Sequence, residues 1–163
     1  MTSDKTAPAR ILVVDDNKEL ANILVEYLSK LGHKAVAAHG GREGLSRFKE
    51  GGFHMVITDL IMPDMDGMEL LNAVKGLENR AIVLVIAACG TIDTAVKAIE
   101  NGAYDFISKP VDFKTLEVVV NRALERHFIG KRLIAFRRLI WVTLICAPVL
   151  LIVGIIVTFF QNR

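Results

Sequence analysis

The sequence has little cysteine, and it contains no acidic residue after position 125. Its 163 residues include two cysteines, Cys89 and Cys146, whose positions give neither metal-ligand spacing nor a basis for a disulfide framework. The first ten residues, MTSDKTAPAR, hold no apolar stretch, so we expect no secretory signal peptide. Internal repeats and low-complexity tracts are also lacking. These absences argue against a disulfide-rich secreted domain and predict a reduced, cytoplasmic globular part.

The charged residues divide the chain into two regions of opposite sign. Residues 1–125 hold 14 Lys and Arg and all 18 Asp and Glu, a balance of −4. Residues 126–163 hold the other six basic residues. The net charge of +2 for the whole chain therefore describes neither region. At this length we expect one full domain plus an appendage.

Apolar runs alternate with helical patterns through most of the chain. Five runs predict strands, at residues 11–14, 34–38, 55–58, 82–87 and 104–107. Apolar residues at helical spacing follow each run, and Asn17 and Asp112 are suited to cap the first and last of the five helices. Repeated strand–helix units predict an α/β fold built on a parallel sheet. The pattern by itself gives no strand order.

Four polar residues lie just past three of these strands. Asp15 and Asp16 follow the first strand, Asp59 follows the third, and Lys109 comes after the fifth. The carboxyl ends of parallel strands lie at one edge of a sheet, so these side chains can converge there. Three neighbouring carboxylates repel one another, and Mg²⁺, which prefers carboxylate oxygens, would relieve that repulsion.

A carboxylate beside Mg²⁺ and a lysine is equipped to act as a nucleophile in phosphoryl transfer. A single Asp at a strand end is most often a turn former or a helix cap, and a single Lys is most often solvated. Chance is a poor explanation for four such residues at three strand ends.

Three motifs carry a resemblance to a known family. Asp15-Asp16, the run TDLIMPDMDG around Asp59, and SKP at 108–110 resemble the receiver domain of two-component response regulators. The segment 90–110 is similar to receivers of the nitrogen-regulation type, and the resemblance as a whole covers about residues 9–127. It implies a flavodoxin-like, five-stranded parallel sheet in the order 2-1-3-4-5 with five helices.

The resemblance also implies a function and the residues that perform it. Asp59 is expected to accept a phosphoryl group from a sensor histidine kinase or a phosphotransfer protein, in a Mg²⁺-dependent phosphorelay. The expected metal ligands are Asp15, Asp16, Asp59 and the backbone carbonyl of Ile61. Lys109 would contact the phosphoryl group, and the Lys109–Pro110 peptide bond would be cis.

One position departs from the family pattern. Receivers usually carry Thr or Ser at the end of the fourth strand, where the hydroxyl binds the phosphoryl group, and this chain has Ala87. Thr58 is a poor substitute because neighbouring residues of a strand point to opposite faces, while Thr91 stays open as one. Phe106, at the family's aromatic switch position, can still change rotamer. We therefore expect phosphorylation to survive and its coupling to conformation to be weakened or rerouted.

The last long feature is an apolar segment, Leu139–Phe160, of 22 residues without a charge. As a helix it would span about 33 Å, enough to cross a hydrocarbon core of about 30 Å. A buried core helix is the alternative, but a receiver already has its five helices. Six basic residues flank the segment, five before it and one after it: Arg126, Lys131, Arg132, Arg137, Arg138 and Arg163. This bias predicts a single-pass anchor in the bacterial inner membrane, with the receiver in the cytoplasm.

The sequence thus predicts five parts: a disordered start at 1–8, a receiver at 9–127, a basic linker at 128–138, a transmembrane helix at 139–160 and a tail at 161–163. We expect partners to be the kinase and membrane lipid, with no nucleic acid, because the basic run lacks a nucleic-acid-binding context. Gly154 and Thr158 allow a weak homodimer. We expect no enzyme activity on an external substrate, beyond slow loss of the chain's own phosphoryl group.

Two alternatives remain open at this point. The chain can be a receiver-like adaptor at the membrane that no longer switches, which would fit Ala87. It can also be a hydrolase of the haloacid-dehalogenase-like kind, which also uses a strand-end Asp as nucleophile. That family requires a second Asp two residues later, where this chain has Ile61.

Overall fold

The computed structural model describes residues 8–88 and 92–126, which form alternating strands and helices. The chain divides into two units between Glu125 and Arg126, and the first of them contains the whole sheet. The elements are β1 (Arg10–Val14), α1 (Lys18–Lys30), β2 (Lys34–Ala38), α2 (Gly41–Lys49), β3 (Met55–Asp59), α3 (Gly67–Leu77), β4 (Ile82–Ala87), α4 (Ile92–Glu100) and β5 (Asp105–Ser108). A last helix is described over residues 113–126.

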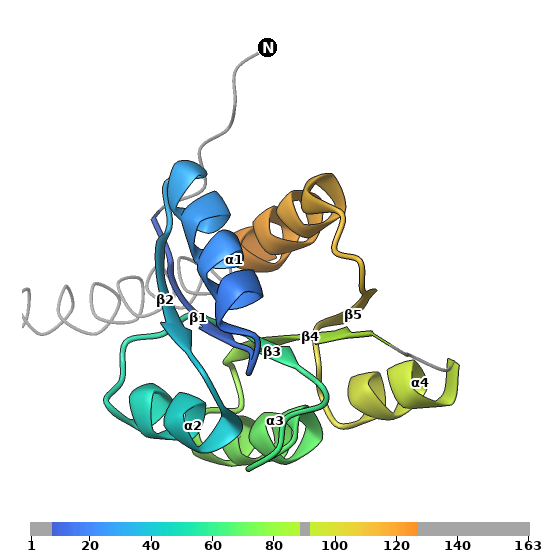
Figure 1. Cartoon of the computed structure of the whole chain (residues 1–163). Coiled ribbons are helices and arrows are strands. Elements are labelled where there is room, and N and C mark those ends of the chain that lie inside the picture. The colour runs from blue at the N-terminus through green and yellow to red at the C-terminus, as the bar shows by residue number, and fades with distance from the viewer. Residues whose placement is uncertain (1–7, 89–91, 127–163) are drawn as a thin grey trace, which may run out of the picture. The chain divides into compact units, whose positions relative to one another are not determined.

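The five strands form one parallel sheet in the order β2-β1-β3-β4-β5. Helix α1 and the helix 113–126 cover one face of this sheet, and α2, α3 and α4 cover the other (Figure 1). Tyr27 connects α1 to the helix 113–126: its ring lies 4.8 Å from that of Phe113, and its hydroxyl donates a hydrogen bond to Glu117. The expected flavodoxin-like sheet and its strand order are confirmed.

The central strands are buried on both faces, which explains their sequences. Every residue of β3 and β4 is buried, as the uninterrupted apolar runs predict for strands covered by helices on both sides. A cluster of buried side chains fills the space between the sheet and α2 and α3, with Leu12, Val56, Leu70 and Val83 among its members. The strand ends are therefore held on a rigid, well-packed support.

Side chains at the helix starts fix where the helices begin. The Asn17 side chain accepts a hydrogen bond from the Leu20 amide, and Asp112 accepts one from the Thr115 amide, as expected for both caps. Asp66 and Glu69 form a reciprocal capping box at α3. This box starts α3 at Gly67.

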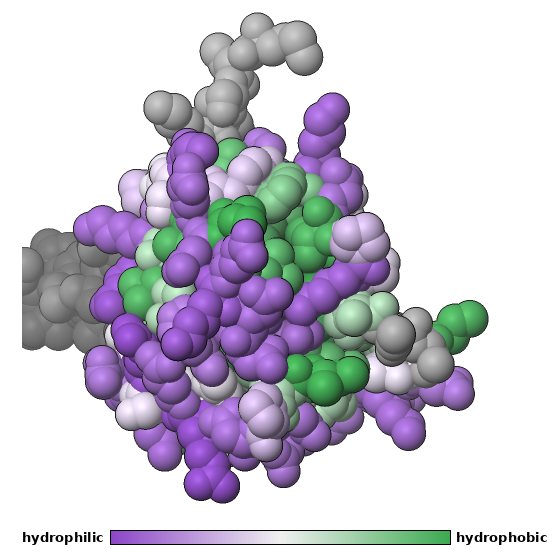
Figure 2. Space-filling view, viewed as in Figure 1, coloured by the Kyte–Doolittle hydropathy of each residue, from purple (hydrophilic) through white to green (hydrophobic). Residues whose placement is uncertain are grey.

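The structure corrects three details of the sequence prediction. Asp59 is the last residue of β3 and does not follow it, and β5 covers 105–108 in place of 104–107. The apolar residues of α4 are largely exposed, and its buried residue is Ala98. In Figure 2 the α4 end of the molecule accordingly shows apolar surface.

The part of the chain that the structure describes contains no helix both long enough and apolar enough to cross a membrane. The predicted span at 139–160 and the basic linker at 128–138 lie outside that part, as does Thr91.

Candidate functional site

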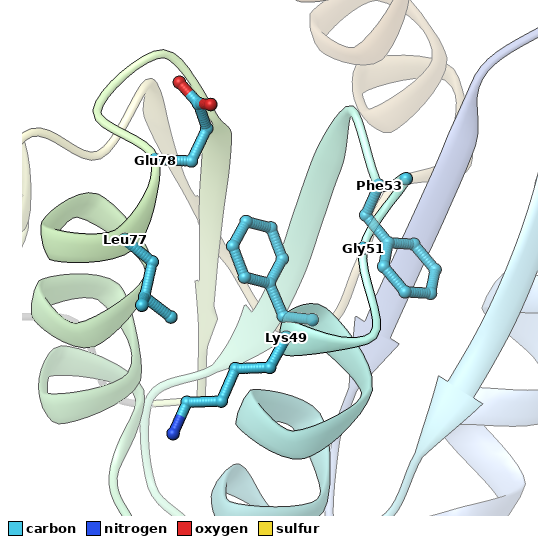
Figure 3. A pocket seen from close by; sticks show the side chains of 7 residues that line it. Lys49, Gly51, Phe53, Leu77 and Glu78 are labelled. Carbon is cyan, nitrogen blue, oxygen red and sulfur yellow. The ribbon is translucent and has the colours of Figure 1, made fainter.

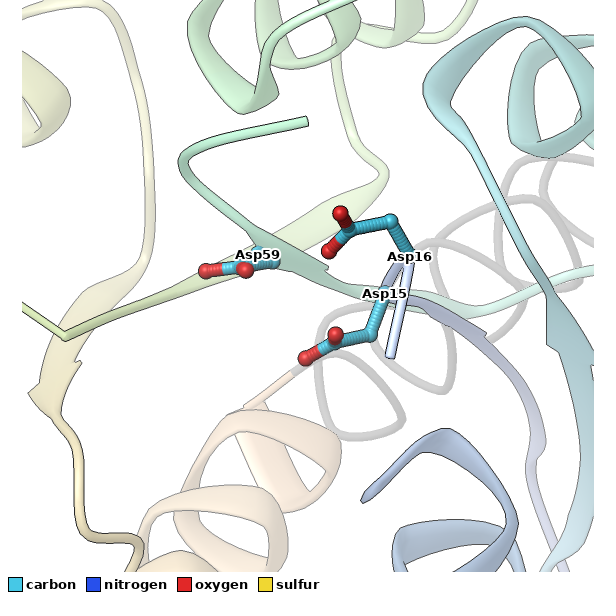
Figure 4. Close-up of side chains that lie close together, drawn as sticks. All are labelled: Asp15, Asp16 and Asp59. Atoms are coloured by element: carbon cyan, nitrogen blue, oxygen red, sulfur yellow. The ribbon is translucent and has the colours of Figure 1, made fainter. Parts of the chain in front are cut away.

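The carboxylates predicted to converge come together at the carboxyl edge of the sheet. β1 and β3 are neighbours, with Val14 in register with Thr58, so the residues after β1 lie beside the end of β3. Asp15, Asp16 and Asp59 each place one carboxylate oxygen within 4.8 Å of the others (Figure 4). Asp15 and Asp59 are buried, whereas Asp16 is exposed.

Lys109 bridges the two buried carboxylates. Its Nζ lies 2.9 Å from Asp15 Oδ2 and 2.9 Å from Asp59 Oδ2, although the lysine is 94 residues away from Asp15 in the chain. The lysine arrives from the end of β5, where its own amide donates to the Ala87 carbonyl at 2.8 Å. The Lys109–Pro110 peptide bond is cis, as the family resemblance implies. One cation thus neutralises part of the charge of a cluster that three separate strands build.

The environment of Lys109 keeps it charged. Burial lowers the pKa of its ammonium group, but hydrogen bonds to Asp59 and Asp15 and the charges of these carboxylates outweigh burial. The pKa therefore lies above the ordinary value for lysine. Lys109 is protonated at any physiological pH and serves as a fixed positive charge.

The remaining carboxylate oxygens of the buried pair are held by backbone amides. Asp59 Oδ1 accepts a hydrogen bond from the Leu60 amide at 2.8 Å, and Asp15 Oδ1 accepts one from the Asn17 amide at 2.9 Å. Both side chains are thus fixed in one orientation, with Oδ2 of each turned to Lys109. Sequence reasoning did not identify these amides, because every residue carries one.

The donor set fits a hard divalent cation. Two ligands of an octahedral Mg²⁺ lie at most about 4.2 Å apart, given metal–oxygen distances of about 2.1 Å. The three oxygens lie within 4.8 Å of one another, so a modest approach would bring them to one ion. Asp16, which is exposed, can turn toward an ion that enters from solvent. Asp15, Asp16 and Asp59 would therefore hold the ion, with water and a backbone carbonyl completing its shell.

The end of β4 offers no hydroxyl to the site. Ala87 is fully buried and lies in register with Ser108 of β5. The Thr58 hydroxyl donates to the Asp59 carbonyl at 2.9 Å, so it is directed to the backbone as strand geometry predicts. Phe106 is half-buried and packs against the core cluster. The described residues therefore provide the acid pocket and the lysine, without a hydroxyl from Thr58 or position 87.

The loop between β3 and α3 holds one predicted ligand and one residue that sequence reasoning missed. The Ile61 side chain is 65% exposed, so only its backbone carbonyl is suited to the expected role. Asp64 in the same loop accepts hydrogen bonds from the first amides of α2. The sequence shows it only as one of several turn-forming residues. The available signal was the lack of a capping residue at Gly40–Gly41, which leaves α2 to be capped from elsewhere.

A pocket of about 290 Å³ lies at the opposite edge of the sheet, between the ends of α2 and α3 (Figure 3). Its walls are polar and apolar in nearly equal parts, with apolar side chains from Phe48, Phe53 and Leu77 and glycine backbone at 51 and 52. The charged ends of Lys49 and Glu78 point away from each other. Among the described residues, the acid cluster is therefore the stronger candidate for the functional site.

Comparisons with known proteins agree with this geometry. The model of the response regulator receiver domain matches residues 11–121. The DNA-binding transcriptional regulator NtrC of Azospirillum brasilense is 39% identical over 120 residues, which are 73% of this chain and 25% of that protein. The transcriptional regulatory protein ZraR of Escherichia coli is 37% identical over 114 residues, 70% of this chain and 26% of that protein. The chain therefore spans about a quarter of the length of these relatives.

Solved structures show the same architecture. A response regulator receiver domain from Clostridium thermocellum has a TM-score of 0.71 and 31% identity, covering 74% of this chain and 98% of that one. NtrX from Brucella abortus, in complex with ATP, has a TM-score of 0.73 and 33% identity, covering 78% of this chain and 29% of that one.

Proposed function

The chain belongs to the response regulator receiver family, and from that premise we propose that it is a phosphoprotein of a two-component system whose phosphoacceptor is Asp59. Receivers of this family take phosphoryl groups from histidine kinases. The observation that carries the proposal is the convergence of Asp15, Asp16 and Asp59 with Lys109 at the carboxyl edge of the sheet. The haloacid-dehalogenase-like alternative lacks support, because position 61 is an exposed Ile and no relative of that kind is among the similar proteins described above.

Asp59 is the nucleophile in the proposed reaction. A carboxylate oxygen attacks the phosphorus of the donor, a P–O bond to Asp59 forms, and the P–N bond of the donor phosphohistidine breaks, after which the imidazole takes up a proton. The Leu60 amide fixes Asp59 Oδ1 and so orients the carboxylate. Asp15, Asp16, Asp59 and the Ile61 carbonyl would hold Mg²⁺, which would supply positive charge to offset that of the phosphoryl oxygens.

Lys109 supplies the second positive charge. In the structure it lies 2.9 Å from the carboxylate that becomes phosphorylated. When Asp59 carries the phosphoryl group, the ammonium can pair with a phosphoryl oxygen by a short movement of its flexible side chain. In this proposal, phosphorylation moves Lys109 from the Asp59 carboxylate to a phosphoryl oxygen.

A direct experiment tests this function. The purified full-length chain is incubated with Mg²⁺ and acetyl phosphate, and its intact mass is measured. We expect a gain of one phosphoryl group that disappears when the metal is chelated. If the mass stays unchanged with acetyl phosphate and with any histidine kinase, while Mg²⁺ binds, the chain is a receiver-like adaptor that does not switch.

The missing hydroxyl at position 87 leads to a prediction about switching. Ala87→Thr would place a donor at the end of β4, where the phosphoryl group needs one, and should enlarge the phosphorylation-dependent change in hydrogen exchange across residues 92–108. Ala87→Val is the matched control, since it has the same shape without the hydroxyl. Both variants add bulk at a fully buried position, at an expected cost of about 1 kcal/mol in unfolding free energy. An equal response in the two variants would contradict the role of the hydroxyl.

The proposed output is contact with another protein. NtrC and ZraR are named as transcriptional regulators, but this chain spans about a quarter of each. The described residues leave apolar side chains exposed on α4, next to β5 and Phe106, at Ile92, Val96 and Ile99. A partner that packs against α4, β5 and the helix 113–126 would sense a change at Phe106. We propose no catalysis on an external substrate, and no nucleic-acid binding by the receiver itself.

We further propose that Leu139–Phe160 anchors the receiver to the cytoplasmic side of the bacterial inner membrane. The support is the length of the uncharged segment and the basic residues before it. Such a tether would raise the effective concentration of the receiver toward a membrane-bound kinase.

Membrane fractionation tests the tether. We expect the full-length chain to sediment with membranes and to stay there in high salt, which would release a protein held only by its basic residues. Leu150→Arg should shift it toward the soluble fraction, because a charge at mid-membrane costs about 3 kcal/mol on insertion scales. Asn162→Arg, outside the segment, is the control. Release of the wild-type chain by salt alone would overturn the anchor.

A further inference from the structure

We propose that Asp64 is a positioning residue for the metal site: by capping α2, it holds in place the β3–α3 loop that carries the Ile61 carbonyl. The inference rests on the proposed function, since it concerns the Mg²⁺ that phosphoryl transfer uses. It assigns a role to a residue that touches neither the metal nor the phosphoryl group.

The carboxylate of Asp64 bonds to the first turn of α2 with both oxygens. Oδ1 accepts a hydrogen bond from the Gly41 amide and Oδ2 accepts one from the Arg42 amide, each at 3.0 Å. These bonds join residues more than 20 positions apart in the chain. The hydrogen bond from the Arg42 amide has the largest effect on the pKa of Asp64 and lowers it, whereas desolvation raises it by less. The carboxylate is therefore charged at neutral pH. Its negative charge also suits the positive end of the helix.

Helix α2 depends on this external cap. The residue before it, Gly40, has no side chain to accept from the free amides of the first turn. A side chain there would also crowd the cap, because a Cβ on Gly40 would lie 3.0 Å from both Asp64 oxygens. A Cβ on Gly41 would collide with the Met65 carbonyl oxygen and lie 2.8 Å from Met65 Cβ. The loop and the helix start are thus packed backbone against backbone.

The other end of the loop is tied to the sheet. The Gly67 amide donates to the Leu60 carbonyl at 2.8 Å and closes the loop at its neck. The Leu60 amide donates to the Ile86 carbonyl at 2.9 Å and to Asp59 Oδ1 at 2.8 Å. Residues 61–66 are therefore held at the neck by the backbone and at the far end by Asp64.

Ile61 lies between these two attachments and is poorly held by its own side chain. That side chain is 65% exposed, whereas the next residue, Met62, is 6% exposed and packs in the buried core cluster. Freeing Asp64 would leave the loop attached at its neck, at Met62 and at the Asp66–Glu69 capping box, with more freedom for the peptide at Ile61. Residues that orient metal ligands typically contribute 10- to 100-fold to metal affinity.

A plain structural role for Asp64 makes a different prediction. If Asp64 only caps α2, its replacement lowers the stability of the fold and leaves Mg²⁺ affinity unchanged, because α2 supplies none of the expected metal ligands. Asp112 provides a matched case. Its carboxylate accepts from the Thr115 amide at 3.1 Å and caps the helix 113–126 in the same way, without contact to the β3–α3 loop.

The test uses the full-length chain with three substitutions: Asp64→Ala, Asp64→Asn and Asp112→Ala. Mg²⁺ affinity is measured by isothermal titration calorimetry, and amide hydrogen exchange is measured without metal. We expect Asp64→Ala to weaken Mg²⁺ binding about tenfold, the low end for such residues. Exchange should accelerate at 41–42 and also at 61–66. Asp64→Asn keeps one acceptor oxygen, so its Mg²⁺ affinity and exchange rates should lie between those of Asp64→Ala and wild type. This variant should fold even if the alanine variant does not.

Asp112→Ala should lose stability and keep wild-type Mg²⁺ affinity. The inference is overturned if the folded Asp64 variants bind Mg²⁺ as wild type does, or if faster exchange is confined to α2. It is also overturned if Asp112→Ala weakens Mg²⁺ binding equally. Absence of Mg²⁺ binding by the wild-type chain would be a different result, since it would remove the proposed function itself.

Discussion

Replacing Asp59 by asparagine is expected to abolish phosphorylation completely. The amide has nearly the shape of the carboxylate and can still accept from the Leu60 amide, so the loop should keep its position. It lacks the anionic oxygen that attacks phosphorus, and it removes one of three charges that attract Mg²⁺. Intact-mass measurement after incubation with Mg²⁺ and acetyl phosphate should show the unmodified chain only.

Asp112→Asn is the matched control for that experiment, since it also exchanges a carboxylate for an amide. Asp112 is exposed and lies at a helix start away from the acid cluster. This variant should be phosphorylated as the wild type is. If Asp59→Asn still gains a phosphoryl group, another residue is the acceptor and the assignment of Asp59 is refuted.

The second large effect is expected from Lys109→Met. Methionine has a similar length but no charge, so Asp15 and Asp59 would face each other in a buried site without their common partner. Removing one member of a buried ion pair is costly; because Lys109 is partly exposed, we expect a loss of about 2 kcal/mol in metal-free unfolding free energy. Chemical denaturation with and without Mg²⁺ measures it.

The metal should reverse most of that loss. Mg²⁺ and Lys109 neutralise the same carboxylates, so Mg²⁺ should stabilise the methionine variant more than the wild type. Lys114→Met, a lysine in the first turn of the last helix, serves as control and should show the wild-type response to Mg²⁺. If Lys109→Met is as stable as wild type without metal, the two short ion pairs contribute nothing to the folded state.

Much of the fold follows from simple sequence patterns. The apolar runs predicted at 55–58 and 82–87 form buried strands, because helices cover both faces of the sheet. The pattern could not supply the strand order, which came from the resemblance carried by the residues around Asp59. It also could not orient α4: Ile92, Val96 and Ile99 lie at helical spacing but are exposed, since periodicity marks an apolar stripe without showing what covers it.

The site was predictable where it depends on strand ends and less so where it depends on loops. Asp15, Asp59 and Lys109 meet because parallel strands end at one edge, a constraint visible in the sequence. Asp64 was missed because a helix cap is normally sought just before its helix, whereas α2 receives its cap from a loop more than 20 residues later. Contacts between segments that are distant in sequence leave no local pattern.

The position of Lys109 near the end of the domain has a consequence for synthesis. A nascent chain that has left the ribosome only through β4 already contains Asp15, Asp16 and Asp59, but it lacks the ammonium group that pairs with two of them. Lys109 follows β5, so synthesis adds this group after all three carboxylates. The carboxylates therefore gain their cationic partner only when synthesis has passed β5, near the end of the domain.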